Sequence, residues 1–333
     1  MTATLQERRN YSTEKILRLR SSLTGAERVL LSKACVYATG SFGRREAGQH
    51  SDLDAFIVSV MQDESAAPAD QKPALRVLDA ILIQADLIKA TRDLGLPDFD
   101  GDGRFLALHN VHSLVHTLGK PDDDANNTFT ARLLLLLESY PLIGEDAYNQ
   151  VIGKVINKYW RDFKGHETCF RPAFLVNDIL RLWRTFCINY EAKTENTPEQ
   201  KKIARRVKNF KLKFSRLLTC YSAIAELLEC YGENKTVTQA DAVAMVKRSP
   251  TERIEEIIKK SSGQKATDFA QIKESYSDFL DRTKGGDDDL RNKFLDDGYK
   301  NDAMRRANDF ADQVSRALKH YENGNDFYRI ILV

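Results

Sequence analysis

The sequence predicts an α+β protein in which a small mixed-sheet domain is followed by a mostly helical domain. Short apolar runs bounded by turn residues, as expected for strands, are confined to the first half of the chain. Beyond residue 145, nearly every stretch repeats apolar residues at the spacing of an amphipathic helix. We therefore expect a leading helix at 1–24, a mixed α/β domain at 25–150 and a helical domain at 151–333.

The leading helix has Ile16, Leu19 and Leu23 on one face.

Helices and strands alternate in the mixed domain. Asp and Asn residues at 122–127 are typical of a helix start and are expected to cap the Leu-rich helix that follows. The predicted elements are strands at 34–38, 53–60 and 105–109, a loop at 62–73, and helices at 74–94, 111–118 and 128–139.

The helix at 74–94 is predicted from a repeat of apolar residues at helical spacing. The residues of this repeat are Leu75, Leu78, Ile81, Leu82, Ala85 and Ile88.

The second half of the chain is predicted to be helical, with a turn or flexible loop at 285–289. The predicted helices span 146–163, 172–193, 199–231, 236–262, 266–283 and 301–322.

Composition indicates a soluble intracellular protein. The net charge of +2 among 29% charged residues does not indicate an extensive nucleic-acid surface. The polar start of the chain lacks a secretory signal, and the apolar run at 133–137 is too short to cross a membrane. We expect a cytoplasmic location and no membrane partner.

Five cysteines without a Cys-x-x-Cys pair are expected to be free, buried thiols: Cys35, Cys169, Cys187, Cys220 and Cys230.

The most informative stretch is 40–57, which holds a Gly-Ser pair and then two aspartates separated by one residue. Gly40 permits a tight turn close to a ligand, and Ser41 offers a hydroxyl and an N–H to phosphate oxygens. Asp52 and Asp54 point to the same side of a strand, while Leu53 between them points into the core. Two carboxylates on one side suit Mg²⁺, which prefers oxygen ligands shared with phosphates.

This stretch resembles the signature of the nucleotidyltransferases of the DNA polymerase beta superfamily, above all the bacterial uridylyltransferases that modify the PII signalling protein. A second likeness is the helix and turn at 130–145, which resembles the segment that closes the nucleotidyltransferase module in that group. The resemblance covers roughly 25–150. The residues of the first motif are Gly40, Gly43, Arg44, Glu46, Ser51, Asp52 and Asp54.

The resemblance implies a two-metal nucleotidyl transfer with Mg²⁺ or Mn²⁺ at Asp52 and Asp54. It also implies that Gly40, Ser41 and Arg44 (or the neighbouring Arg45) contact the phosphates of a nucleoside triphosphate.

The family pattern includes a third carboxylate on a later strand. The predicted strand at 105–109 carries none, which is a departure from that pattern. Asp102 is our choice for this catalytic role, and Asp93, Asp98 and Asp100 are alternatives. An Asp-x-Asp pair without a third carboxylate could bind nucleotide and metal without turnover.

Two polar features of the helical domain are further candidates. Residues 201–216 include eight basic side chains, of which Lys211 and Lys213 are chosen for the triphosphate because related enzymes often place a lysine of the second domain there. The alternative is a solvated amphipathic helix whose apolar stripe faces the core. A polar stripe at 177–184 could face the nucleotide cleft or simply form ion pairs on the helix surface.

Our leading hypothesis is a metal-dependent nucleotidyltransferase that transfers an NMP from an NTP to an acceptor hydroxyl. The acceptor is left open between a protein side chain, an RNA end and another nucleotide. Two alternatives are a nucleotide-sensing protein with weak or no catalysis, and an RNA-end binder that acts through 201–216.

Overall fold

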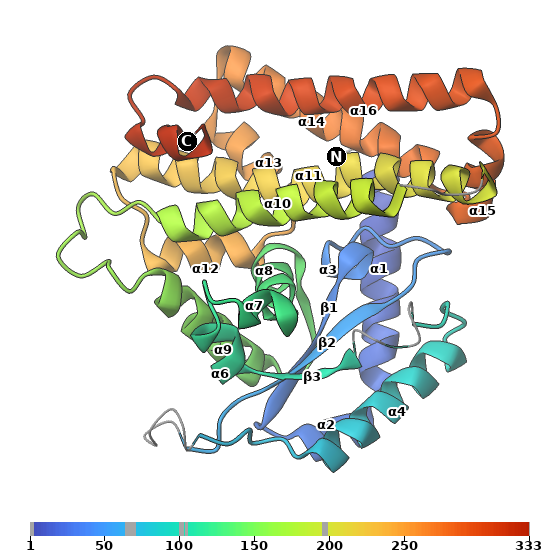
Figure 1. Cartoon of the computed structure of the whole chain (residues 1–333), viewed down its shortest axis with the longest axis vertical. Helices are drawn as coiled ribbons and strands as arrows, with labels where there is room; N and C mark the ends of the chain where they lie inside the picture. Colours follow the sequence, from blue (N-terminus) through green and yellow to red (C-terminus); the bar gives the residue numbers. More distant parts are fainter. Residues whose placement is uncertain (1–2, 64–70, 100–102, 104–105, 195–198, 333) are drawn as a thin grey trace. The chain divides into compact units, whose positions relative to one another are not determined.

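The computed structural model describes residues 3–63, 71–99, 103, 106–194 and 199–332, and it divides into two compact units (Figure 1). One unit comprises Gln6–Arg161 and contains the sheet. The other comprises Met1–Leu5 and Asp162–Val333 and is helical. This confirms the predicted α+β class. The division falls at Arg161, later in the chain than the predicted boundary at 150.

The sheet unit is organised around four strands in the order β3-β2-β1-β4. β1 is antiparallel to both β2 and β4, whereas β2 and β3 are parallel, so the sheet is mixed. β4 was not predicted, because its four residues include a proline and follow the Leu-rich helix directly. The strands are β1 (Ala34–Thr39), β2 (Asp54–Ser59), β3 (Leu108–Asn110) and β4 (Tyr140–Ile143).

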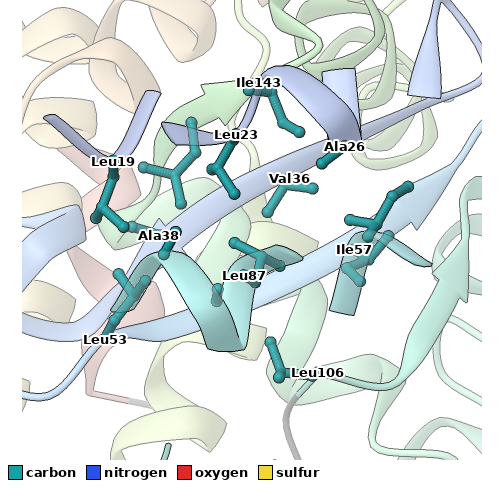
Figure 2. Packing of buried hydrophobic residues seen from close by; sticks show 14 of the residues in the cluster. Leu19, Leu23, Ala26, Val36, Ala38, Leu53, Ile57, Leu87, Leu106 and Ile143 are labelled. Carbon is teal, nitrogen blue, oxygen red and sulfur yellow. The ribbon is translucent and has the colours of Figure 1, made fainter. Parts of the chain in front are cut away.

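An apolar cluster of the sheet unit lies between the sheet and α1 (Ala3–Ser22), α2 (Thr24–Leu30) and α4 (Val77–Asp93). Figure 2 shows Leu19, Leu23, Val36, Ile57 and Leu87 among the residues of this cluster. The strands supply every second residue to this face, as the pleat requires.

The apolar repeat from which the 74–94 helix is predicted lies only in part on the buried side, where Leu75 is buried and Ile88 packs against the apolar cluster. Leu78, Ile81 and Leu82 are more than half exposed, whereas Ile83 and Leu87 are fully buried. Apolar residues occupy both sides of this helix, so the repeat predicts the helix but does not by itself identify the buried side.

The opposite face of the sheet is covered by a second group of helices. Tyr37 on β1 stacks on Phe56 of β2 with ring centroids 5.7 Å apart, and it also contacts Tyr148. The helices of this group are α6 (Val111–His116), α7 (Asp122–Ala125), α8 (Thr128–Glu138) and α9 (Glu145–Tyr159).

A buried ion pair replaces the expected cap of the Leu-rich helix. Asn127 at the N-cap of α8 has a left-handed φ of 55° and makes no capping hydrogen bond with its side chain. Instead, Asp123 accepts hydrogen bonds from Thr128 at 2.7 Å and from Arg132 at 2.6 and 2.9 Å. Both charged side chains are fully buried.

The helical unit is built around the long α11, which packs against α10, α13 and α16. Two predicted elements need correction. The 236–262 helix is two helices, because Ser249 starts a new one with a capping box and Pro250. The 285–289 loop instead falls mostly within α15. The helices are α10 (Ala173–Thr194), α11 (Glu199–Asn234), α12 (Gln239–Lys247), α13 (Pro250–Lys260), α14 (Gly263–Arg282), α15 (Gly286–Lys293) and α16 (Asp297–Leu318).

The cysteines are free thiols, as expected, but only Cys35 and Cys220 are buried, whereas Cys187 and Cys230 are half-buried and Cys169 is exposed. None of the helices in the described ranges combines the length and the apolar character that a bilayer crossing requires.

Candidate functional site

The Gly-Ser turn forms a short helix, α3 (Gly40–Gly43), directly after β1. Gly40 has a φ of +63°, a conformation that favours glycine. A Cβ atom at this position would lie 2.5 Å from Oδ2 of Asp54, so the Asp54 carboxylate packs against the backbone of the turn. The turn and this aspartate, which are distant in the sequence, therefore form one local site.

The two aspartates lie at the start of β2, with the alternation expected of a strand. Leu53 is 1% exposed, while Asp52 and Asp54 on either side of it are half-buried. Asp54 is paired with Thr39 in the β1–β2 ladder, and Asp52 precedes the strand. The carboxylates thus lie where β2 begins, next to the turn that follows β1.

Arg44 is fixed within the protein by two carboxylates. Its Nε donates to Glu46 at 2.9 Å and its Nη1 donates to Glu138 at 2.8 Å, and all three side chains are buried. Glu138 also accepts a hydrogen bond from the Gly40 N–H at 3.3 Å. The predicted contact between Arg44 and a phosphate is untested, and the contacts seen here are structural.

Sequence reasoning missed Glu138, the last residue of α8. A possible signal was its place directly after five consecutive leucines, where a carboxylate inside the core needs a basic partner.

Arg45 adopts a left-handed conformation with a φ of 59°. This conformation is uncommon for a residue with a side chain. Its guanidinium lies 5.8 Å from the centroid of the Tyr140 ring on β4. Such strain is often found at functional turns, where the surrounding structure maintains it.

We expect Gly43→Ala to destabilise the sheet unit by about 1–3 kcal/mol or more, because a core without space resists added atoms. An added Cβ would lie 2.0 Å from the carbonyl oxygen of Glu138 and 2.8 Å from that of Ala38. Thermal unfolding monitored by circular dichroism measures the effect. Gly153→Ala on α9 is the matched control, since a Cβ there meets nothing within 4 Å. Equal melting temperatures for the Gly43 variant and the parent protein would contradict this view of the turn.

The third carboxylate is not identified by the structure. Asp93 is exposed at the end of α4, and Asp98 is exposed and forms an ion pair with Arg92 at 2.9 Å. Asp100 and Asp102 lie outside the described residues. Within the described ranges, no group of three or more His, Cys, Asp or Glu side chains is arranged to hold a metal ion. Asp52 and Asp54 are therefore the two carboxylates that the described part of the chain offers to a metal at this turn.

The basic residues chosen from the helical domain lie on α11 and have polar partners within that unit. Lys211 pairs with Asp287 on α15, and Lys213 Nζ donates to the Asn308 side chain on α16 at 2.9 Å. The apolar stripe of α11, including Phe210 and Phe214, is buried, as the alternative of an amphipathic helix requires. The proposed triphosphate contacts of both lysines remain predictions.

The polar stripe on α10 contains an ion pair. Arg181 lies 4.0 Å from Asp178, three residues earlier. This contact agrees with the alternative in which the stripe satisfies its own charges on the helix surface.

Searches with this chain found no matching protein-family model, curated protein or solved structure. The functional interpretation therefore depends on the motif and on the geometry of the turn. Half-buried carboxylates on one side of a strand end are suitable ligands for a hard divalent cation that also binds phosphates.

Proposed function

We propose that this protein is a metal-dependent nucleotidyltransferase that moves an NMP from an NTP to an acceptor hydroxyl. One observation carries the proposal: the Asp54 carboxylate packs against the Gly40 backbone, at a turn that requires glycine. A backbone without side-chain bulk beside carboxylates can receive a triphosphate and its metal together.

In the proposed reaction, Asp52 and Asp54 hold Mg²⁺ or Mn²⁺, which on binding neutralises triphosphate charge and lowers the pKa of the attacking hydroxyl. The acceptor oxygen forms a bond to the α-phosphorus, the bond from that phosphorus to the bridging oxygen breaks, and pyrophosphate leaves. The acceptor proton passes to solvent. Ser41 is half-buried beside Gly40, and we assign its hydroxyl the role of donating a hydrogen bond to a phosphate oxygen.

The chain's main contribution is to hold these groups in fixed positions. Glu138 restrains the Gly40 amide, and the β1–β2 ladder fixes Asp54 opposite Thr39. Catalysis of phosphoryl transfer depends largely on such placement and on charge neutralisation.

The second candidate is a nucleotide-binding regulatory protein with weak or no turnover. It is favoured by one observation: the described residues provide no cluster of three metal-binding side chains. Two carboxylates can still bind a metal–nucleotide complex, because Mg²⁺ retains several waters and takes phosphate oxygens.

The test is turnover of each of the four labelled NTPs with Mg²⁺ or Mn²⁺, with and without cellular RNA and protein extract. Transfer of label or release of pyrophosphate is the expected result, and the labelled species identifies the acceptor as protein, RNA or nucleotide. Metal-dependent NTP binding without either product would instead favour the regulatory protein. Absence of both binding and turnover would reject the nucleotide site.

A further inference from the structure

The side of α4 that faces away from the sheet unit's apolar cluster is itself apolar. Ile83 and Leu87 already bury one side of the helix within that cluster. Every exposed residue from 77 to 85, a stretch that the structure describes in full, is apolar as well. We call these exposed residues the α4 stripe: Val77, Leu78, Ile81, Leu82 and Ala85.

The α4 stripe is a contiguous surface and not a set of scattered residues. Its four larger members are between 51% and 70% exposed. Their spacing at i, i+1, i+4 and i+5 places them on one side of the helix over about two turns. A single exposed apolar residue is ordinary, whereas a contiguous group of them is typical of an interaction surface. The packing of the sheet unit does not account for this side of α4.

Leu31 adds another exposed apolar side chain near the start of α4. It is 62% exposed and has a left-handed φ of 48°, which is uncommon for a residue with a side chain. It ends α2, the helix that packs against α4 (Figure 1). The Ser59 hydroxyl lies 3.3 Å from the Lys33 carbonyl oxygen and accepts a hydrogen bond from the Leu75 N–H at 2.9 Å. Leu31 is therefore held near the N-terminal end of the stripe.

The exposed apolar area is about what a self-association surface needs. A large aliphatic residue with this exposure presents on the order of 100 Å². Leu31 and the four larger members of the stripe then present roughly 500 Å², which is near the largest patch on a typical monomer. Two such surfaces face to face would bury about 1,000 Å² in total, where specific interfaces begin. We expect a weak, reversible dimer from this area.

The α4 stripe is complementary to itself when two copies of the helix run antiparallel. A two-fold axis makes both copies use the same surface. If the axis passes at Ile81, Val77 lies four residues before it and Ala85 four residues after it. The larger side chain of one copy then meets the smaller side chain of the other, and Ile81 meets its own counterpart. Alternation of large and small side chains is what close helix packing requires.

The charges on one flank of α4 agree with this pairing. Arg76 and Asp86 are each five residues from Ile81, so the axis places Arg76 of one copy level with Asp86 of the other. Arg76 donates to Asp79 at 2.9 and 3.0 Å, and Asp79 is two turns from Asp86 on the same flank. The Arg76 side chain is 74% exposed and is accessible to a second copy.

The basic end of α4 does not oppose the stripe in this arrangement. Lys89 is the first exposed charged residue after the stripe and lies eight residues beyond Ile81. Its level on the other copy is that of Pro73, which precedes the start of the helix at Val77. The antiparallel direction also places the positive end of each helix dipole beside the negative end of the other.

We propose that the α4 stripe is a self-association surface through which two copies of this chain form an antiparallel, two-fold dimer. The exposed area, the match of Val77 with Ala85 and the level of Arg76 with Asp86 all favour a second copy as the occupant. The proposal does not depend on the nucleotide site, because none of these residues belongs to the Gly40 turn or to the Asp-x-Asp pair.

The first test is sedimentation velocity of the full chain across the micromolar concentration range. The monomer has a mass of 37.9 kDa, and we expect the average mass to rise toward twice this value as the concentration increases. Ile81→Lys places two like charges face to face at the axis, so it should weaken the dimer about tenfold or more. Ile188→Lys makes the same change at an exposed position of α10 and should associate like the parent.

Cross-linking with a short bismaleimide tests the pairing itself. The background is Cys169→Ser, which removes the exposed native thiol and serves alone as the control. Ile81→Cys should cross-link to itself. Val77→Cys should cross-link to Ala85→Cys in a mixture far more than to itself, because the antiparallel pairing separates the two 77 positions by about 12 Å along the helix.

A parent protein that stays monomeric at every concentration rejects the proposal, whatever the folding of the variants. A dimer that a folded Ile81→Lys variant leaves unchanged, or that does not cross-link position 77 to position 85, rejects the α4 stripe as its interface. The sedimentation experiment is repeated on Asp52→Asn/Asp54→Asn, where the dimer is expected to persist. Failure of the dimer and failure of nucleotidyl transfer are therefore separate results.

Discussion

Asp52→Asn/Asp54→Asn is expected to reduce NTP turnover by about 10³-fold or more while leaving the fold intact. Metal coordination contributes several kcal/mol of transition-state charge stabilisation, and each 1.4 kcal/mol corresponds to a tenfold change in rate. Asparagine keeps the shape of the side chain but loses the charge that binds the cation. Both positions are half-buried, and Asp54 lies beside the Gly40 turn, so the substitution leaves the core unchanged. The measurement is the initial rate of pyrophosphate release at saturating Mg²⁺.

The matched control is Asp122→Asn/Asp312→Asn, which removes the same charge from two exposed positions. It should retain the parental rate. If the variant at 52 and 54 turns over NTP within a few-fold of the parent, the Asp-x-Asp pair is not the metal site. If the parent shows only metal-dependent NTP binding, loss of that binding in the same variant would support the regulatory protein.

Asp123→Asn is expected to destabilise the sheet unit by about 3–5 kcal/mol, because it leaves the buried charge of Arg132 without its counterion. The two side chains are fully buried and 2.6 Å apart. Arg132 also donates to the Leu114 carbonyl at 3.0 Å, so α6 and α8 are held together through it. At roughly 2–4 °C per kcal/mol, we expect the melting temperature to fall by about 10 °C. Asp122→Asn, at the exposed neighbouring position, is the control.

This stabilisation should depend on pH in a specific direction. Burial by itself would raise the pKa of Asp123, but hydrogen bonds from Arg132 and Thr128 hold it below its ordinary value. A lowered folded-state pKa gives stability that is present above the unfolded pKa of about 3.9 and is lost as the pH falls through the folded value. The difference between the parent and Asp123→Asn, measured by urea unfolding, should therefore shrink below about pH 4. A difference that is constant down to pH 2 would contradict the assignment.

Local signals were enough to predict most elements of the sheet unit. β1 is an apolar run that ends at the Gly-Ser pair, and β2 is an apolar run that begins at the Asp-x-Asp pair. The positions of both strands can therefore be predicted from the sequence. β4 and the buried side of α4 could not be predicted from the local sequence, because each depends on which other elements of the chain pack against it. Leu78 and Leu87 are equally apolar, but only Leu87 faces the cluster formed with α1 and the sheet.

The candidate site could be predicted only in part, for the same reason. The Gly40 turn and the alternation around Leu53 are properties of contiguous residues, so the sequence reveals them. The contact between Asp54 and Gly40 requires the β1–β2 pairing, and the role of Glu138 requires the end of α8 to reach the turn. A third carboxylate would have to be brought to this site from a distant part of the chain. The residue type alone therefore does not show which Asp or Glu it is.

The hydrogen bonds of Glu138 have a consequence for the entropy of ligand binding. This carboxylate restrains the Gly40 amide and the Arg44 guanidinium at once, so the turn is ordered before any ligand arrives. Ordering a loop on binding costs free energy, which a preorganised site does not lose. Affinity at this turn should therefore be determined by the contacts made with the ligand, with little contribution from folding of the loop around it.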